Sequence, residues 1–592
     1  MSASLPTTAS AIAEAVGKGQ TSALAVATAV VARIRAYDAI QPQAWISRFA
    51  DDDILAMARA VDARISAGEA LPLAGVPFAV KDNIDVAGLP TTAACPDFAY
   101  VPQAHAHVVE RMIAAGAVCI GKTNLDQFAT GLNGTRSPFG APACVFNRAY
   151  ISGGSSSGSA VAVAAGLVPL ALGTDTAGSG RVPAAFNGLI GMKPTKGRWS
   201  TAGLVPACRS LDCISVFSRT LEDARLVDEV VAGFDPSDAY SRRLEDRPAA
   251  PQRIGVPRLA QRQWCGDCES AFLYDKALEA LRAMGMELVE IDLTPLSQAA
   301  ELLYGGPWVA ERTAALAPML ASNPGAIDPA VRAIVEGGQA VSGVAVFEGH
   351  YRLAALQREV ERLWEGVDML ALPTAPTTYR IREMQAAPIA LNSLLGLYTN
   401  FVNLLDMAAL ALPAGHRHNG PGFGLTLMGP AWTDHALLET GQRYLTAAAL
   451  PPAPPLDLGD RMDTVKLAVV GAHLKDMPLH WQLTSRDARF VGATETAPTY
   501  RLYAMADSVP PKPALIHDPQ GAAIQVEIYE LDMAAFGSFV AEVPPPLAIG
   551  TVMLADGSSV KGFVAEPRAI AGARDITALG GWRAFIDQHA GA

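Results

Sequence analysis

Hydrophobic and polar positions change their spacing repeatedly along residues 1–450. Residues 11–34 carry apolar side chains at helical intervals, whereas the short apolar run 73–80 has the length of a buried strand. The same alternation predicts further helices at 108–115 and 156–165, and further strands at 117–120, 167–172, 253–256, 287–291, 369–372 and 407–412. Helices that alternate with short apolar strands predict an α/β domain, in which helices flank a parallel or mixed sheet.

The pattern changes after the proline-rich run 451–455, which cannot continue a helix or a central strand. Beyond it, apolar and polar residues alternate or β-branched residues gather, with turn residues between them. These segments are 465–470, 499–503, 524–529 and 550–554. We therefore predict two domains, residues 1–455 and a smaller α+β domain at 465–592, joined by a Pro-rich linker.

Composition narrows the classes of function. The 592 residues are 50% hydrophobic and carry a formal net charge of −12, which disfavours non-specific binding to nucleic acid. The apolar run 160–172 is broken by Gly166 and Pro169, so it predicts buried core rather than a membrane span. The first residues show no basic region before a long apolar core, and seven scattered cysteines form no disulfide pattern. We expect a cytoplasmic protein.

Cys265 and Cys268 have the spacing of a redox or zinc motif. Neither a second such pair nor a pair of histidines accompanies them nearby. Four zinc ligands therefore cannot be assembled from neighbouring motifs, and we interpret the pair as part of a surface loop before a helix. We expect no metal site.

The candidate chemistry lies in two segments rich in small residues, 153–159 and 173–181. Small residues allow the backbone to approach a ligand closely and to aim several N–H groups at one point. Lys81 ends the apolar run 73–80, where burial would lower the pKa of its amine and allow it to act as a base. This combination favours an acyl-transfer enzyme with a serine nucleophile.

Ser155 and Ser179 are separated by enough chain for a helix and a strand, so both can return to one rim of a sheet. Two alternatives use the same glycines and serines. A phosphate-binding loop would need a closing Gly-Lys-Ser/Thr, which is missing here. A nucleophile elbow at 154–158 would need an Asp and a His in the hydrolase order, and nothing around the later histidines supports that role.

With these motifs in view, the chain resembles the amidase signature family over residues 5–450. The resemblance rests on 153–160, 174–184 and 191–195. It implies the amidase-signature fold, with Lys81 as base, Ser155 as bridging serine after a cis peptide bond, and Ser179 as nucleophile. The implied oxyanion hole consists of the backbone N–H groups of Thr176, Ala177, Gly178 and Ser179. The family's mechanism requires no cofactor and no metal.

Within that family, residues 301–312 resemble the substrate segment of allophanate hydrolases. The resemblance implies that Arg312 grips a small carboxylate, with a hydroxyl donated by Tyr304. The alternative is an arginine on a helix face that pairs in solvent. Residues 121–135 resemble the loop that borders the family's substrate pocket, which implies contacts from Gly131, Leu132 and Asn133, although each also fits a plain turn.

The C-terminal region resembles the extension of allophanate hydrolases at 471–474 and 496–503, a domain similar to the γ-glutamyl cyclotransferase-like fold. This resemblance implies that His473 helps to break down the first product, N-carboxycarbamate. A structural role for a single histidine is the alternative. The chain departs from the pattern at Asp476 and His480, where Gly and Asn are expected, and this departure puts the second activity in question.

Taken together, the resemblance implies hydrolysis of allophanate by a homodimer. The substrate would come from a biotin-dependent urea carboxylase, which we expect to be encoded separately because these residues contain no biotin or ATP-grasp segment. Two alternatives stay open. One is the amidase-type subunit of a glutamine-dependent aminoacyl-tRNA amidotransferase, and the other is an inactive scaffold that binds partners.

Overall fold

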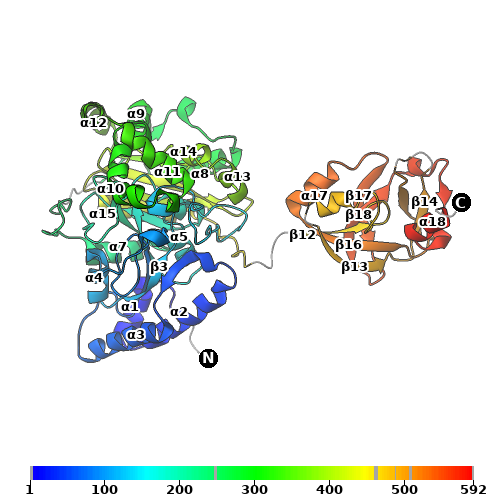
Figure 1. Ribbon diagram of the computed structural model, residues 1–592, viewed down its shortest axis with the longest axis horizontal. Helices are drawn as coiled ribbons and strands as arrows, with labels where there is room; N and C mark the ends of the chain where they lie inside the picture. Colours follow the sequence, from blue (N-terminus) through cyan, green and yellow to red (C-terminus); the bar gives the residue numbers. More distant parts are fainter. Residues whose placement is uncertain are drawn as a thin grey trace. The chain divides into compact units, whose positions relative to one another are not determined.

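The computed structural model describes residues 5–245, 250–458, 464–486, 488–505, 508 and 510–589. The chain divides into two compact units, Met1–Leu456 and Asp457–Ala592, which we call the N-terminal unit and the C-terminal unit. Figure 1 shows that both contain strands and helices. Each unit is described separately.

A sheet of eleven strands in the order β1-β3-β2-β4-β6-β5-β10-β11-β9-β7-β8 forms the centre of the N-terminal unit. Parallel pairs, such as β2 with β3 and β4, coexist with antiparallel pairs, such as β10 with β11, so the sheet is mixed. The strands are β1 Trp45–Arg48, β2 Pro77–Lys81, β3 Val118–Thr123, β4 Leu170–Asp175, β5 Ile190–Lys193, β6 Cys213–Ser218, β7 Arg253–Pro257, β8 Glu287–Ile291, β9 Met369–Pro373, β10 Met407–His416 and β11 Gly422–Pro430.

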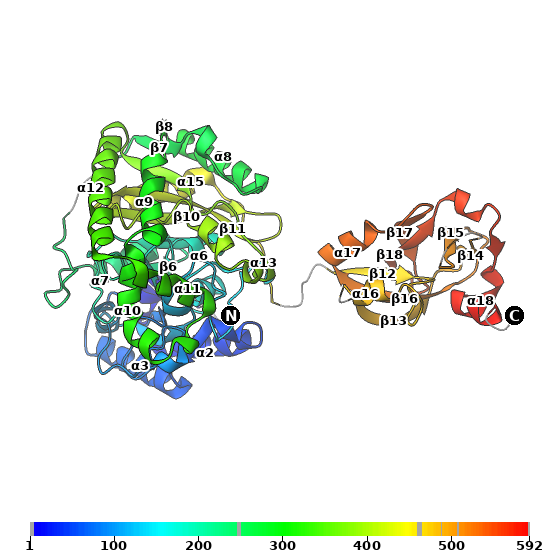
Figure 2. The ribbon, with the colours of Figure 1, turned by 45° about the horizontal axis from the view of Figure 1, so that its top comes forward.

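Helices surround this sheet, and Figure 2 shows the long α12 beside α9. Leucines on the facing sides of these two helices join one buried cluster, which anchors the pair to the sheet. The helices are α1 Ala9–Gly17, α2 Ala23–Asp38, α3 Asp51–Ser66, α4 His107–Ala114, α5 Ser157–Ala164, α6 Val182–Phe186, α7 Leu221–Val231, α8 Cys268–Ala283, α9 Thr294–Gly305, α10 Trp308–Ser322, α11 Pro329–Gly337, α12 Gly343–Gly366, α13 Ile381–Ala386, α14 Ala390–Leu395 and α15 Asp434–Ala448.

Three neighbouring strands position the polar residues that the motifs single out. Strands β2, β3 and β4 are buried along their whole length, as expected of parallel strands covered on both faces. Because they run parallel, their carboxyl ends meet at one edge of the sheet. Lys81 ends β2 at this edge, and Asp175 ends β4.

Helix α5 lies close to the same edge because its first turn is built from small residues. A Cβ at Gly158 would fall 2.2 Å from the carbonyl oxygen of Ala44 and 2.5 Å from the amide nitrogen of Asn124. Such distances exclude any side chain at this position. The serine-rich segment before α5 is thereby held against the ends of the strands.

The C-terminal unit contains a five-stranded sheet, β13-β16-β12-β18-β17, and a three-stranded sheet, β15-β14-β19. Its core is a separate cluster that includes Leu467, Tyr500, Ile528 and Trp582. The elements are β12 Thr464–Val469, α16 Trp481–Thr484, β13 Arg489–Glu495, β14 Tyr500–Ala504, β15 Pro513–His517, β16 Gln525–Asp532, α17 Met533–Val540, β17 Leu547–Met553, β18 Ser559–Ala565, β19 Arg574–Asp575 and α18 Trp582–His589.

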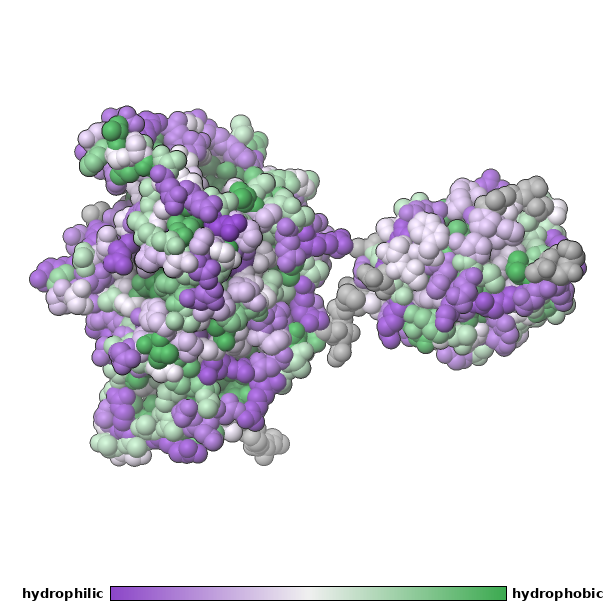
Figure 3. Space-filling model, viewed as in Figure 1, coloured by the Kyte–Doolittle hydropathy of each residue, from purple (hydrophilic) through white to green (hydrophobic). Residues whose placement is uncertain are grey.

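The surface of each unit mixes residue types. In the view of Figure 3, hydrophobic residues are dispersed among hydrophilic ones. Among the described residues, no single helix combines the length and hydropathy needed to cross a membrane, and only the bent pair Pro329–Ala340 and Gly343–Gly366 meets those criteria jointly. Cys265 and Cys268 are exposed free cysteines, the first in a turn and the second at the start of α8.

Candidate active site

Lys81, Ser155 and Ser179 form a continuous line of hydrogen bonds inside the N-terminal unit. The Nζ atom of Lys81 lies 2.8 Å from Oγ of Ser155, which lies 2.9 Å from Oγ of Ser179. The residues are 0%, 0% and 2% exposed, respectively. The bond Gly154–Ser155 is cis, as the resemblance implied. Side chains from three separate segments thus meet at the sheet edge described above.

Among the described residues, the amine of Lys81 contacts hydroxyls and no carboxylate. Besides Ser155, its Nζ donates to Oγ1 of Thr174 at 2.6 Å, a contact that the sequence did not predict. Complete burial is the main influence and lowers the pKa of Lys81 to about 7, while the charges of Asp126, Asp212 and Asp175 oppose this shift. A large fraction of the amine is therefore unprotonated at neutral pH, as a base requires.

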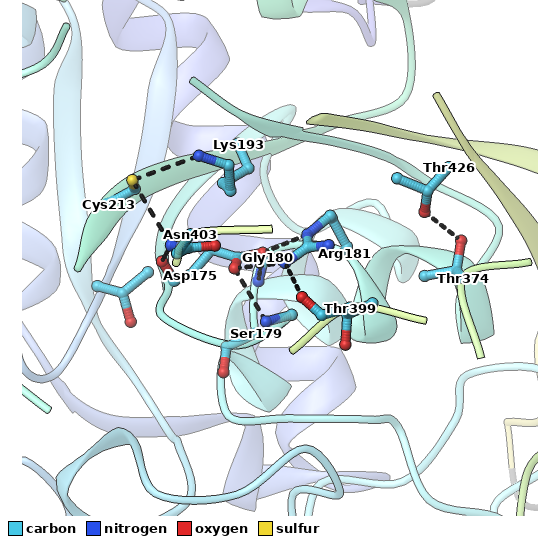
Figure 4. Close-up of polar contacts among 12 residues, drawn as sticks. Asp175, Ser179, Gly180, Arg181, Lys193, Cys213, Thr374, Thr399, Asn403 and Thr426 are labelled. Carbon is cyan, nitrogen blue, oxygen red and sulfur yellow. Dashed lines mark hydrogen bonds and ion pairs between the residues drawn. The ribbon is translucent and has the colours of Figure 1, made fainter. Parts of the chain in front are cut away.

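The loop that carries Ser179 is held from within by a buried ion pair. The Asp175 carboxylate accepts from the guanidinium of Arg181 at 2.8 and 2.9 Å, and from the N–H groups of Gly178 and Gly180 at 2.9 and 3.0 Å. Figure 4 shows Ser179 on the loop between these contacts. The carboxylate and the guanidinium are both fully buried, so the loop is fixed by charge-assisted bonds.

One expected oxyanion donor is already occupied. The N–H of Gly178 points to Asp175 and is not free to bind an oxyanion, which corrects the expectation from the sequence. Gly178 has φ +134° and lies against Thr399, whose Oγ1 would be 2.5 Å from an added Cβ. Within the described residues, the N–H groups of Thr176, Ala177 and Ser179 form no hydrogen bond and stay available as donors.

Arg312 is a buried cation that feels the charges of Asp212 and Glu311 but forms no direct ion pair among the described residues. It is 1% exposed, and its only hydrogen bond within the described residues runs from Nη1 to Oγ1 of Thr130 at 3.3 Å. Its Nε has no acceptor, and no carboxylate among the described residues forms an ion pair with it. The alternative of a solvent ion pair is therefore wrong. An unpaired buried guanidinium is costly, and an anionic ligand would relieve that cost.

Tyr304 lies directly against Arg312. The guanidinium carbon is 5.0 Å from the centre of the tyrosine ring, within the range of a cation–π contact. The two residues do not share one helix, because α9 ends at Gly305 and α10 begins at Trp308. The side chains of Tyr304 and Arg312 nevertheless meet across the Gly-Gly-Pro segment that separates the two helices.

The loop at 131–133 borders the nucleophile through its first residue. The carbonyl oxygen of Gly131 lies 3.5 Å from Oγ of Ser179. The N–H of Leu132 donates to Oδ1 of Asn392, and the N–H of Asn133 donates to Asp126. Of the three expected contact residues, the backbone N–H groups of Leu132 and Asn133 are thus occupied within the protein, and that of Gly131 has no partner among the described residues.

A cavity of about 380 Å³ adjoins this region. Tyr304 lines it from the side of Arg312, and Asn392 lines it from the side of the 131–133 loop. Arg136 also lines it and is 2% exposed. The cavity is large enough for a ligand of a few non-hydrogen atoms and is the place from which such a ligand would meet Tyr304.

His473 occupies a different pocket, of about 230 Å³, in the C-terminal unit. Its Nε2 lies 2.7 Å from Oε1 of Gln482, and its ring is stacked on Phe563 at 5.0 Å. Burial lowers the pKa of this imidazole, so it is neutral at pH 7. Lys512 lines the same pocket and forms no ion pair within the described residues.

The departures from the family pattern near His473 have a local explanation. Asp476 has φ +65°, the left-handed conformation in which Gly is favoured and Asp is tolerated. The ring of His480 turns to Tyr529, with Nε2 3.1 Å from the hydroxyl. Neither Asp476 nor His480 lines the pocket around His473. Both departures therefore lie outside the residues that line the pocket.

Sequence reasoning missed several polar residues around the site. Thr174 contacts Lys81, Thr130 contacts Arg312, and Asp126 lies beneath the 131–136 loop. All three fall within segments that carried the family resemblance, so position in a motif was the available signal. Glu311 also lies in such a segment, 301–312, but its partner Ser210 is distant in sequence. Asp212 lies outside these segments and had no such signal.

Comparison with known proteins places this geometry in a family. The amidase family model matches residues 28–438, and a model of the allophanate hydrolase C-terminal domain matches residues 465–587. The chain therefore belongs to the amidase family. Membership in that family and the α/β fold with a mixed sheet, both predicted from the sequence, are confirmed.

Individual relatives show which members of the amidase family this chain is similar to. Urea amidolyase of Saccharomyces cerevisiae is 45% identical over 573 residues, which is 92% of this chain but 31% of that protein, so the chain spans about a third of this relative. Allophanate hydrolase of Kluyveromyces lactis has a solved structure with 42% identity and a TM-score of 0.71, covering 96% of this chain and 98% of that one. A glutamyl-tRNA(Gln) amidotransferase subunit from Roseiflexus castenholzii is 36% identical, over 73% of this chain and 94% of that protein. The predicted resemblance to allophanate hydrolases is confirmed.

Proposed function

We propose that this protein is an allophanate hydrolase. One observation carries the proposal: an unpaired, buried guanidinium, that of Arg312, belongs to the same unit as a buried Lys–Ser–Ser relay. The relay suits attack on an amide, and the guanidinium suits a substrate that also bears a carboxylate. Allophanate has both groups, separated by one nitrogen. Similarity to the Kluyveromyces lactis enzyme over nearly the whole chain supports this choice.

The relay explains how Ser179 becomes a nucleophile. The hydroxyl protons can rotate, so the same oxygen and nitrogen positions allow Ser179 to donate to Ser155 and Ser155 to donate to a neutral Lys81. When Ser179 attacks the terminal amide carbon, one proton moves from Ser179 to Ser155 while another moves from Ser155 to Lys81. The carbonyl oxygen becomes negative as the new C–O bond forms.

Backbone N–H groups without a partner among the described residues would bind the negative carbonyl oxygen of the substrate. The donors of Thr176, Ala177 and Ser179 would stabilise it, and each such donor typically contributes about 2.7–4 kcal/mol. The proton returns through Ser155 to the leaving nitrogen, the C–N bond breaks, and ammonia departs. Water then attacks the acyl-enzyme by the same relay and releases N-carboxycarbamate, which restores the hydroxyl of Ser179.

Arg312 and Tyr304 would hold the carboxylate end of the substrate. A guanidinium can bind a carboxylate through two parallel hydrogen bonds, and Nε of Arg312 has a free donor for one of them. Tyr304 stacks against the guanidinium and lines the adjoining cavity, from which its hydroxyl can reach a ligand. Gly131 would contact the substrate at its opposite end, next to Ser179.

The C-terminal unit would carry out the next step, the loss of CO2 from N-carboxycarbamate. Its pocket combines the neutral imidazole of His473 with apolar walls from Phe539 and Phe563, and two charged residues, Lys512 and Glu542, also line it. The apolar walls destabilise a carboxylate relative to CO2, and the lysine would keep the anion bound. As the C–N bond breaks and CO2 leaves, the nitrogen would take one proton from water, which gives carbamate. The resulting carbamate decomposes to ammonia and CO2.

Supply of the substrate would depend on a biotin-dependent urea carboxylase, to which we propose a functional coupling. Similarity to urea amidolyases supports this link. We further propose that the protein is a cytoplasmic homodimer. Size-exclusion chromatography with light scattering would test the dimer.

A direct assay tests the proposed function. Purified protein is given allophanate or glutamine, and the ammonia released is measured by a coupled enzyme reaction. We expect release from allophanate alone. Release from glutamine alone would instead favour an amidotransferase component, the second candidate, which the relatives at 36% identity support for the N-terminal unit. No release from either substrate would favour the inactive scaffold.

A further inference from the structure

The position of Arg312 depends on the helix that carries it. Within the described part of the chain its guanidinium makes one long hydrogen bond, of 3.3 Å, so few polar contacts fix the side chain itself. Helix α10 begins at Trp308 without a side-chain cap, directly after a break from α9. Buried Trp308 and Val309 pack the first turn of α10 against the core, and a polar contact can add a fixed direction to that packing.

Glu311, the residue before Arg312, supplies that contact. Its carboxylate accepts from the N–H of Ser210 at 2.7 Å, from Oγ of Ser210 at 2.7 Å and from Sγ of Cys208 at 3.0 Å. All three bonds go to the segment 207–211, which precedes β6. Bonds to a carboxylate are stronger than neutral ones, so Glu311 is a firm attachment for the helix.

The same segment is attached on its other side to the oxyanion loop. Asp212 is buried and accepts from the N–H groups of Ala207 at 2.9 Å and Cys208 at 3.1 Å. It also accepts from Oγ1 of Thr176 at 2.5 Å. The segment 207–211 therefore links α10, through Glu311, to the loop of Thr176, through Asp212. Arg312 and the oxyanion donors are thus tied to one common piece of backbone.

We propose that Glu311 is a positioning residue that fixes the distance between Arg312 and the oxyanion hole, and thereby selects substrates by length. The inference rests on the proposed function. In allophanate a single nitrogen separates the carboxylate from the carbonyl carbon under attack. A site with this fixed spacing discriminates against a compound with one more methylene, because its carboxylate and carbonyl cannot occupy both positions at once.

Charge and position act in opposite directions at Glu311, which makes them separable. As a negative group beside Arg312, Glu311 weakens the attraction of that residue for an anion, so removal of the charge alone would favour substrate. Loss of the three hydrogen bonds would instead free α10 and disfavour substrate. Glu311→Gln removes the charge and keeps an acceptor for the N–H of Ser210, whereas Glu311→Ala removes both.

The experiment compares kcat and KM for three compounds. These are allophanate, biuret, in which a neutral amide replaces the carboxylate, and N-carbamoylglycine, which is one methylene longer than allophanate. We expect Glu311→Ala to raise KM for allophanate about tenfold with kcat within about threefold of wild type. The preference for allophanate over N-carbamoylglycine should fall by a similar factor. Biuret should change little, and Glu311→Gln should stay within about threefold of wild type for allophanate.

Two further variants test whether the effect comes from the hydrogen bonds of Glu311 to the segment 207–211. Glu359→Ala removes an exposed carboxylate from α12 and should match wild type. Ser210→Ala removes one of the three bonds and should shift the preference about threefold in the same direction. This variant carries the test if Glu311→Ala does not fold, as judged by its unfolding midpoint.

Three results would overturn the inference: an unchanged preference in Glu311→Ala, an equal loss of kcat/KM for all three compounds, or a Glu311→Gln variant as impaired as the alanine variant. Failure of the proposed function is seen separately, as a wild-type protein that releases no ammonia from allophanate.

Discussion

The two units place their candidate chemistry in contrasting surroundings. In the N-terminal unit, Lys81, Ser155 and Ser179 are enclosed and linked to one another by hydrogen bonds of 2.8 and 2.9 Å. In the C-terminal unit, His473 is only partly buried and lies among aromatic rings, and its ring is hydrogen-bonded to the side chain of Gln482.

The contrast follows from the chemistry proposed for each unit. Amide cleavage needs a nucleophile, a proton path and donors for an oxyanion, all at fixed positions, and the sheet edge supplies them through short loops. Decarboxylation of an anion needs mainly a site that excludes water and holds one carboxylate. We propose that His473 and Lys512, in a pocket with aromatic walls, serve that smaller requirement.

The largest expected effect comes from removing the nucleophile of the N-terminal unit. Ser179→Ala removes the nucleophile, and we expect ammonia release from allophanate to fall roughly 10⁴-fold or more. The control is Ser66→Ala, at an exposed serine near the end of α3. The unfolding midpoint should stay at the wild-type value. Ammonia release at the wild-type rate would remove Ser179 from the mechanism.

A smaller effect is expected at the substrate end of the same site. Arg312→Met deletes a buried guanidinium, and we expect KM for allophanate to rise roughly 10- to 100-fold, as for loss of a charge-assisted bond. Arg332→Met, on α11, where the arginine pairs with Glu336 near the surface, is the matched control. An unchanged KM would show that Arg312 does not bind the carboxylate.

The dependence of activity on pH tests the state of Lys81. The pKa of this amine lies near 7, and only the unprotonated form accepts a proton, so activity should be full above that value. As pH falls below 7, kcat/KM should drop about tenfold per pH unit. Asp212, with its pKa raised to about 6, adds a second change below that pH, because it bonds Thr176. A flat profile between pH 5 and 8 would contradict a lysine base.

The smallest expected change concerns the release of the second ammonia rather than the first. His473→Ala should release one ammonia quickly from each allophanate and the second slowly, whereas wild type should release both at the enzymatic rate. The comparison is made by counting ammonia and CO2 over time, with a chain cut after residue 455 beside it. His517→Ala, at an exposed histidine of the same unit, is the control. Two rapid ammonia molecules from the His473 variant would assign it a structural role.

Much of the fold could be predicted because its central strands are short apolar runs. Strands β2 and β4 are buried from end to end, so each gives a clear signal in the sequence. Strand β11, Gly422–Pro430, gave none, because its glycines are typical of turns. A Cβ at Gly424 would lie 2.5 Å from Cβ of Ala185, so this glycine serves close contact with α6 instead.

The site likewise has residues that the sequence could predict and contacts that it could not. The positions of Lys81, Ser155 and Ser179 follow from motifs and a family resemblance, which specify residues along the chain. The occupied N–H of Gly178 depends on how the loop turns back to Asp175, and residue types alone do not determine that turn. The link from Ser210 to Glu311 spans 101 residues, a separation that only the folded chain closes.

Because Lys81 is enclosed, its amine can act as a base toward Ser155 without reacting with reagents in the solvent. An unprotonated amine is the form that reacts as a nucleophile with dissolved electrophiles, and most lysines avoid such reactions by remaining protonated. Lys81 is partly uncharged at neutral pH yet has no exposed surface, so reagents in the solvent cannot reach it while Ser155 can. Labelling of amines on the native protein should therefore spare the most basic residue of the relay, which its own fold protects.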